Sequence, residues 1–415
     1  MSPPPDAISV AVEWVLPTLA AAALLCLALR PPSAEAPDPL RGWRGAAAFL
    51  ATRVAYAVVL LVVLDRPFRS DMWAWRSNTD GMARGEVPGR DFFNLYGPLY
   101  PYLQAWGRWL TPGHHPLGTL WIFVAGDALA VSCGTLLARD LLGPGGARVA
   151  RSWLLLDPIL WHQLVVRAQD ESLFVGTLAA AAWLVHRERR ASAAAALAFG
   201  FCATKVTYGP YALAVLLAMW GGGRKGIGPA ALFAALVVAA YAWYLSTGAS
   251  LLSDSNFETH SVNWGVGVSA TDGVARVLPS FPKAAALAAY GLGTAAALGV
   301  AAVVSRGMPA GPRAVALLCV AHAMSLLTMP FCVSPYLAQG VVPVLLLFLV
   351  RVPGDPGRRW RLAGLATVSW LGAMHWTQWR GFSLPMKPVA IAFHAVVLAE
   401  AWRVLKGRAG PGGTA

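Results

Sequence analysis

The stretch from residue 69 to residue 106 holds the densest mixture of charged and aromatic side chains in this sequence. It reads RSDMWAWRSNTDGMARGEVPGRDFFNLYGPLYPYLQAW and contains three aspartates and one glutamate among arginines and aromatic residues. A carboxylate placed beside a hydroxyl group can remove its proton and so act as a general base. The alternative interpretation of Asp71 is a solvated loop aspartate at a membrane boundary, because this residue follows a long apolar run.

The rest of the chain is much more apolar than this stretch. Of its 415 residues, 57% are hydrophobic and only 13% are charged, and the mean hydropathy is +0.55. Soluble domains carry about 25% charged residues. Because apolar runs of about 20 residues recur along the sequence, we expect residues 1–415 to form a single polytopic membrane domain. The net charge of +13 does not indicate nucleic-acid binding, because the basic residues are spread over short loops between the apolar runs.

These runs predict an all-α transmembrane helical bundle with about 11–13 spans, some of them short enough to be re-entrant or broken helices. The N-terminal run follows MSPPPDAIS, which lacks the basic region of a cleavable signal peptide, so we expect it to stay as a span. The predicted spans lie near residues 8–29, 45–64, 116–138, 152–167, 172–186, 191–207, 208–222, 227–247, 284–304, 313–330, 337–350, 362–379 and 388–405.

Arginine and lysine gather in alternate loops, which predicts that these loops face the cytoplasm. The N-terminus is then outside and the C-terminus inside. The basic set comprises Arg30, Arg41 and Arg44; Arg139, Arg148 and Arg151; HRERR at 186–190; GRKG at 223–226; Arg306 and Arg313; RVPGDPGRRWR at 351–361; and Arg403, Lys406 and Arg408.

The other set of loops is longer and mixes acidic, aromatic and amide side chains, so we expect the working face to lie outside the cytoplasmic membrane. Its two large members are the loops 65–115 and 248–283, and the aromatic part of the first is expected to contain helices lying along the membrane surface. The shorter members are RAQDES at 167–172, TKVTYG at 204–209, FCVSPY at 331–336 and QWRGFSLPMK at 378–387.

Several polar residues fall inside predicted spans, where such side chains commonly have a function. The alternative for Arg53 and Asp127 is a simple ion pair between neighbouring helices. The full set is Arg53, Asp127, Asp157, His322 and His375. The five cysteines have no CxxC or CxH spacing, and the sequence has no Walker-type loop, HExxH, GxSxG or zinc spacing, so nucleotide hydrolysis and zinc proteolysis are not supported.

Taken in order, the motifs of residues 65–350 resemble the GT-C fold glycosyltransferases. The match is to bacterial integral-membrane enzymes that use polyprenyl-phosphate sugars, including the mannosyltransferases of glycosyltransferase family 87. Three departures are Arg167-Ala168 where glycine is usual, Val206 where proline usually follows the lysine, and the extra N-terminal span. The matching segments are Asp71, ARGEVPGRDFF, YGPLYPYL, RAQDESLFVGTLAAAAWLV, AAALAFGFCATKVTYGPYAL and SPYLAQGVVPVLL.

This resemblance implies an inverting transfer of a hexose or pentose from a polyprenyl-phosphate donor to a lipid-linked, glycan or protein acceptor. It assigns the general base to Asp71. Cations would balance the departing phosphate, with Lys205 foremost; the alternative for Lys205 is snorkelling to the surface. Asp91 and Asp170 would orient the acceptor or bind a divalent cation, or else form ion pairs with nearby arginines. The remaining predicted substrate-binding residues are Tyr96, Arg167, Gln169, His260, Trp264 and Arg380.

Two other functions remain open at this stage. A lipid-linked glycan polymerase or ligase would use the same external site. A transporter or flippase of lipid-linked sugars would instead show internal repeats with broken helices in matching halves. No clear repeat is visible in the sequence. The sugar, the acceptor and any metal requirement are not identified by the residues.

Overall fold

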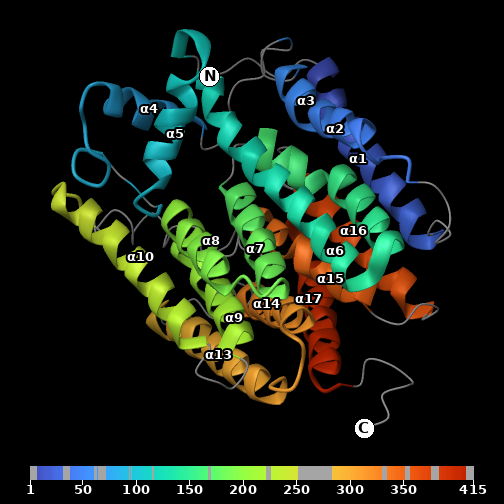
Figure 1. The fold of residues 1–415 in the computed structure, drawn as a ribbon. Coiled ribbons are helices and arrows are strands. Elements are labelled where there is room, and N and C mark those ends of the chain that lie inside the picture. Colours follow the sequence, from blue (N-terminus) through green and yellow to red (C-terminus); the bar gives the residue numbers. More distant parts are fainter. Residues whose placement is uncertain are drawn as a thin grey trace.

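The computed structural model of this chain describes residues 7–30, 38–59, 63, 72–92, 94, 96–114, 116–166, 170–220, 226–250, 283–329, 334–350, 356–374 and 383–407. The helices, labelled in Figure 1, are α1 (Ala7–Leu29), α2 (Trp43–Leu50), η1 (Ala51–Ala55), α3 (Tyr56–Val58), α4 (Met72–Ala83), α5 (Tyr100–Trp109), η3 (Pro112–His114), η4 (Pro116–Thr119), α6 (Leu120–Leu156), η5 (Ile159–Val166), α7 (Glu171–His186), α8 (Arg190–Ala203), η6 (Val206–Tyr208), α9 (Gly209–Trp220), α10 (Ile227–Ser246), α13 (Lys283–Val304), α14 (Ala310–Thr328), η8 (Ser334–Gly340), α15 (Val341–Val350), α16 (Pro356–Met374) and α17 (Ser383–Leu405).

The prediction of an all-α fold is confirmed for the described part of the chain, which contains helices and no β-strand. The count of about 11–13 spans stays a prediction. Five of these helical stretches are long and apolar enough to cross a membrane. They are Val12–Leu29, Leu120–Leu156, Ile227–Ser246, Ala310–Thr328 and Pro388–Leu405. Five shorter apolar helices accompany them.

Helix α6 is two helical stretches that meet at Gly143. This glycine has a positive φ of 74°, a conformation that residues with a side chain rarely adopt. The chain reverses direction at this glycine. The reversal is shown by the closeness of Gly134 and Leu154, because a Cβ atom on Gly134 would lie only 2.8 Å from Leu154 Cδ1. Residues 20 positions apart in a continuous helix would be about 30 Å apart. The reversal places Arg139 and Arg148 on either side of a turn, as the predicted basic loop between two spans requires.

The contacts between loops agree with the two sets that the arginine distribution predicts. Within the basic set, Arg187 Nε lies 2.8 Å from Asp140 Oδ2, and Arg151 pairs with Asp38. Within the other set, Gly97 N donates to Thr204 O at 2.6 Å and Ser250 N to Gly89 O at 2.9 Å. In Figure 1, α4 and α5 lie at one end of the bundle and the end of α17 lies at the other. The described part of the loop 65–115 and the basic C-terminal end of α17 therefore lie at opposite ends of the bundle.

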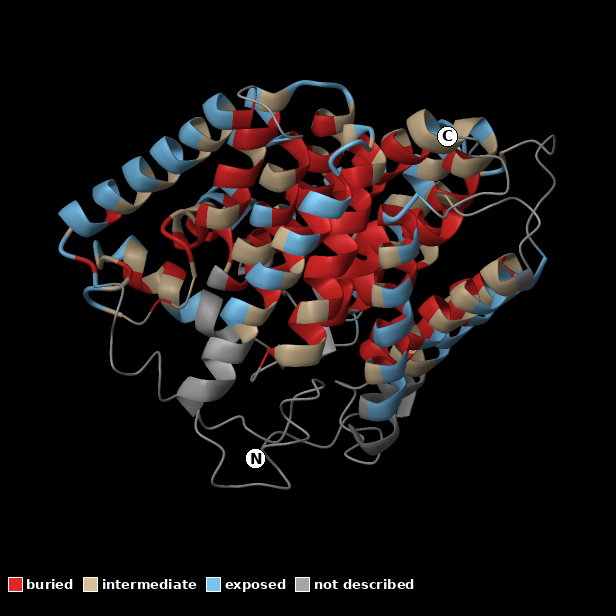
Figure 2. Ribbon diagram, turned by 90° about the horizontal axis from the view of Figure 1, so that it is seen from below, coloured by how far each residue is buried: buried red, intermediate tan, exposed pale blue. Residues whose placement is uncertain are grey.

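The core consists of the buried residues that Figure 2 shows in red at the centre of the bundle. Its largest cluster includes the buried side chains of α6, α7, α9, α14 and α15. Helix α10 is different, because only 6% of the residues in its most apolar 18-residue stretch are buried in the protein. An apolar helix with so little protein around it suits a lipid-facing position at the edge of the bundle.

The assignment of sides is open to a labelling test at Ser77, which is exposed on α4. A Ser77→Cys variant in intact spheroplasts is expected to react with a membrane-impermeant thiol reagent, because the loop 65–115 is predicted to face outward. Of the five native cysteines, Cys133, Cys202 and Cys319 are buried and Cys26 is exposed within an apolar helix. Cys332 lies outside the described residues, in the FCVSPY segment assigned to the outside, so the labelling of the unmodified protein, and of a Cys332→Ser background, is the control. Reaction of the introduced thiol only after lysis would reverse the orientation.

Candidate functional site

Three of the predicted site residues, Tyr96, Asp170 and Lys205, come together at the end of the bundle that carries the non-basic loops. Lys205 Nζ lies 2.6 Å from Asp170 Oδ1 and 3.5 Å from Glu171 Oε1. The ring centroids of Tyr96 and Tyr336 lie 5.1 Å and 5.5 Å from the same nitrogen. Residues that are far apart in the sequence thus surround one ammonium group, and we call these five residues the Lys205 cluster.

Each of the cluster's charged members stands where a helix begins or ends. Asp170 precedes α7 and Glu171 is its first residue, so both carboxylates lie at the positive end of the helix dipole. Lys205 follows α8, which ends at Ala203. Tyr336 lies in the short helix η8. These ends place charged groups at the edge of an apolar bundle, where their solvation cost is lower than at its centre.

The loop that carries Tyr96 is fixed to the end of α8 by its backbone. Gly97 N donates to Thr204 O, and Leu99 N donates to Cys202 O at 2.9 Å. A Cβ atom on Gly97 would collide with the carbonyl of Cys202, so the close approach requires glycine at this position. Tyr96 is thereby brought next to Lys205, although about a hundred residues separate them in the sequence.

The Lys205 cluster is nearly closed to solvent. The Lys205 side chain is 13% exposed, and those of Asp170 and Glu171 are each 1% exposed. Burial favours the neutral amine, but the carboxylates of Asp170 and Glu171 outweigh it, so the pKa of Lys205 lies well above its ordinary value. One ammonium group faces two carboxylates, which gives the cluster a formal charge of −1. Among the described residues Asp170 pairs with a lysine. Arg167, the nearby arginine of the alternative interpretation, lies outside them.

Asp91 does not belong to the Lys205 cluster in this structure. Its carboxylate accepts hydrogen bonds from Arg90 at 2.8 Å and from the backbone N–H of Val87 at 2.7 Å. The Arg90 hydrogen bond, followed by that from Val87, lowers the pKa of Asp91. Arg90 in turn donates to Thr247 O at 3.3 Å. Asp91 thus stabilises a local turn and joins it to the end of α10, and ion pairing with an arginine, the alternative for this residue, is confirmed.

The other predicted site residues lie outside the residues that the structure describes. They are Asp71, Arg167, Gln169, His260, Trp264 and Arg380. Sequence reasoning did not single out two members of the Lys205 cluster, Glu171 and Tyr336. Both stand in segments that were assigned to the non-basic face, RAQDES and FCVSPY, and only the fold shows that they meet. Among the described residues, no group of three or more His, Cys, Asp or Glu side chains is placed to hold a metal ion.

A second polar cluster, centred on Arg53 and Asp127, lies deeper in the bundle. It forms where the chain leaves the helix at Asp157 and Pro158. Residues 152–167 were predicted as one span, but α6 ends at Leu156 and η5 begins at Ile159. Pro158 has no N–H, so the carbonyl of Leu154 loses its helical donor. The N–H of Ile159, which would serve Leu155, donates instead to Asp157 Oδ1 at 3.1 Å. In an apolar interior these carbonyls need other donors.

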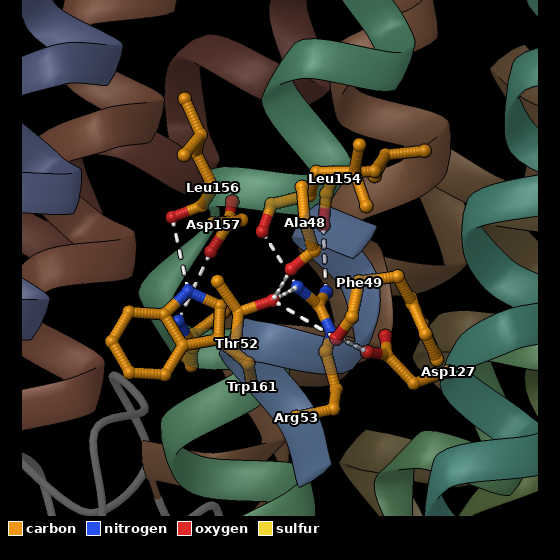
Figure 3. Close-up of polar contacts among 11 residues, drawn as sticks. Ala48, Phe49, Thr52, Arg53, Asp127, Leu154, Leu156, Asp157 and Trp161 are labelled. Carbon is orange, nitrogen blue, oxygen red and sulfur yellow. Dashed lines mark hydrogen bonds and ion pairs between the residues drawn. The ribbon is translucent and has the colours of Figure 1, made fainter. Parts of the chain in front are cut away.

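Arg53 supplies those donors, as Figure 3 shows. Its guanidinium donates to Leu154 O at 2.8 Å and to Leu155 O at 2.6 Å, and it pairs with Asp127. Trp161 Nε1 donates to the next free carbonyl, that of Leu156, at 3.1 Å. A cation at a helix C-terminus is also favoured by the helix dipole. The simpler interpretation of Arg53 and Asp127 is confirmed, because they form an ion pair between helices and hold a broken helix in place.

A third polar group links three helices through neutral imidazoles. His394 Nδ1 lies 2.6 Å from the carbonyl of Ala390, which can only accept, so this nitrogen carries the proton. His394 Nε2 then accepts from His322 Nε2 at 3.1 Å. His322 Nδ1 accepts from the hydroxyl of Tyr211 at 2.8 Å. This assigns each proton in the series of hydrogen bonds from Tyr211 through His322 to His394. The series joins α9, α14 and α17 inside the bundle.

Comparison with known proteins adds no relative. No protein-family model matches the sequence, and no curated protein matches it. The resemblance to GT-C glycosyltransferases therefore rests on the order of the motifs in the sequence.

The ion pair in the Lys205 cluster predicts a measurable coupling between its two members. Lys205→Ala leaves Asp170 buried without its cation, and we expect a loss of about 1.5–3 kcal/mol in the free energy of unfolding, as for hydrogen bonds to charged groups. Lys205→Ala combined with Asp170→Asn should recover part of this loss, because no uncompensated Asp170 charge remains. Denaturation in detergent of Lys205→Ala, of Asp170→Asn and of the double variant, analysed as a double-mutant cycle, measures the coupling. Strictly additive effects would contradict the pairing.

Proposed function

We propose that the chain is a membrane glycosyltransferase that moves a sugar from a polyprenyl-phosphate donor to a lipid-linked, glycan or protein acceptor. The observation that carries the proposal is the Lys205 cluster. Buried carboxylates accept hydrogen bonds from hydroxyl groups, and aromatic rings offer apolar faces to the CH groups of a sugar. Asp170 and Glu171 would bind sugar hydroxyls, and Tyr96 and Tyr336 would lie against the ring.

In the proposed reaction, an acceptor hydroxyl oxygen attacks the anomeric carbon of the donor sugar. The new C–O bond forms as the bond between this carbon and the phosphate oxygen breaks. The acceptor proton goes to the carboxylate of Asp71, and the phosphate leaves on its polyprenyl chain. Because one displacement occurs, the configuration at the anomeric carbon inverts. Lys205, and the cations of the other predicted external loops, would balance the charge of the departing phosphate. Those cations are Arg167, His260 and Arg380.

The proposed site lies at the outer surface of the cytoplasmic membrane. The Lys205 cluster stands among the non-basic loops, and the positive-inside rule assigns those loops to the outside. A polyprenyl-phosphate sugar, which stays in the membrane, can reach such a site from the bilayer. Nucleotide sugars, which are made in the cytosol, cannot. A divalent cation is compatible with the two carboxylates, but the proposal does not depend on one.

The decisive experiment is a transfer assay on purified protein with polyprenyl-phosphate mannose, glucose and arabinose in turn. We expect radiolabel from one donor to pass to an acceptor in a membrane extract, with release of polyprenyl phosphate. Growth of one product into a ladder would indicate the polymerase alternative. Movement of labelled lipid between the leaflets of proteoliposomes, without any transfer, would support the flippase alternative and reject the glycosyltransferase.

A further inference from the structure

A buried glutamine on α5 is the feature that the Lys205 cluster leaves unexplained. Gln104 is 0% exposed. Neither its amide nitrogen nor its amide oxygen has a hydrogen-bond partner in the part of the chain that the structure describes. Both groups would be bonded to water in the unfolded chain, so burying them unpaired opposes folding. Where such a residue lies beside a polar and aromatic cluster, a ligand bound at that cluster can supply the missing partners.

The position of Gln104 relates it directly to the Lys205 cluster. It lies one helical turn after Tyr100 on α5, and residues four apart in a helix share a face. The ring of Tyr100 stacks on that of Tyr96, with 4.3 Å between centroids and 24° between planes. Tyr96 in turn covers the ammonium group of Lys205. Tyr96 and Tyr100 therefore lie in sequence between the Lys205 ammonium group and the face of α5 that carries Gln104.

The other side of α5 shows that the burial of Gln104 is specific. Trp106 is 66% exposed and Trp109 is 45% exposed, as suits a helix lying at a membrane surface. A glutamine turned toward that side would have been solvated. Instead the amide stands on the side of the helix that is buried, together with Tyr100 and Ala105.

We propose that Gln104 is a substrate-positioning residue that binds hydroxyl groups of the sugar or of the acceptor beyond the Tyr96–Tyr100 stack. A primary amide donates and accepts at once, so it can pair with two neighbouring hydroxyls of one sugar. The inference rests on the proposed function and adds to it a second polar anchor for an extended, hydroxyl-rich substrate. The carboxylates of the Lys205 cluster and the amide of Gln104 would hold the two ends of that substrate.

The test measures stability and affinity together in purified protein in detergent. The probes are short-chain polyprenyl-phosphate mannose, glucose and arabinose, with polyprenyl phosphate as the lipid alone. Gln104→Leu should raise the Tm of the ligand-free protein, because an unpaired buried amide is replaced by an apolar side chain of similar size. The same variant should bind the sugar lipid about tenfold more weakly, because hydrogen bonds to the sugar are lost. Its affinity for polyprenyl phosphate should not change.

A matched control is available at Gln339. This residue is 1% exposed, and its two amide groups likewise have no partner among the described residues. It lines a small pocket with apolar side chains that include Leu137, Leu178 and Leu318. Gln339→Leu should therefore raise the Tm but leave sugar-lipid affinity unchanged. Gln104→Met serves as a second variant if the branched leucine does not fit.

Each outcome of this test decides a different point. A lower Tm in both Gln104 variants would show that the amide has a partner within the protein and would overturn the inference. Unchanged sugar affinity in the variants, with binding by the unmodified protein, would also overturn it while the proposed function stands. If the unmodified protein binds none of the sugar lipids, the proposed function fails, and the inference fails with it.

Discussion

If the chain is the glycosyltransferase proposed above, Asp71→Asn is expected to abolish nearly all sugar transfer, with a loss of about 10²–10⁴-fold in turnover. Asparagine keeps the shape and one hydrogen-bonding oxygen of the side chain, but it cannot accept the proton of the acceptor hydroxyl. The variant should fold and should still bind the polyprenyl-phosphate sugar. Turnover and donor affinity, measured on the same preparation, separate a lost base from a lost binding site.

Asp91→Asn is the matched control for this experiment. Asp91 accepts hydrogen bonds from Arg90 and from the Val87 backbone, and both partners belong to the same local turn. Its replacement should therefore reduce transfer only mildly. If Asp71→Asn kept more than about a tenth of the normal turnover, the loss would lie below the smallest one expected for a general base. The base would then be sought at Asp170, which lies in the Lys205 cluster, or at Asp91.

Arg53→Met is expected to cause a large loss of stability. Arg53 and Asp127 are both 0% exposed, and removal of one partner of a buried ion pair costs about 3–5 kcal/mol because the other charge stays buried. The same change removes the donors of Leu154 O and Leu155 O at the helix break. Unfolding in detergent, followed by circular dichroism, measures the free energy.

An exposed pair on the same protein provides the reference. Arg84 Nη2 lies 2.8 Å from Glu86 Oε1, and the two side chains are 63% and 34% exposed. Exposed ion pairs contribute about 0–1 kcal/mol, so Arg84→Met should change the free energy of unfolding by no more than that. Equal effects of Arg53→Met and Arg84→Met would show that Arg53 does not hold the broken helix.

The sequence alone determines the membrane class, the helical fold and the grouping of the loops. Long apolar segments are unfavourable in water and enter the membrane, where no water is present to hydrogen-bond the backbone. The backbone N–H and C=O groups must therefore hydrogen-bond to one another, so long apolar segments of a single chain predict helices. The arginines that flank these runs separate the loops into two sets. The contacts Arg187–Asp140 and Gly97–Thr204 agree with that separation, because each joins loops of one set. These properties are local, and local composition is sufficient to predict them.

Only the tertiary structure decided which polar residues meet. Lys205 and Asp170 were both candidates, but the sequence carries no information on the distance between their side chains. Glu171 and Tyr336 stood in the RAQDES and FCVSPY segments without any distinguishing spacing. The pairing of Arg53 with the carbonyls of Leu154 and Leu155 was equally hidden, although Pro158 is visible in the sequence. A broken helix is stable in an apolar interior only if a partner distant in the sequence satisfies its carbonyls, and the fold determines which residue that is.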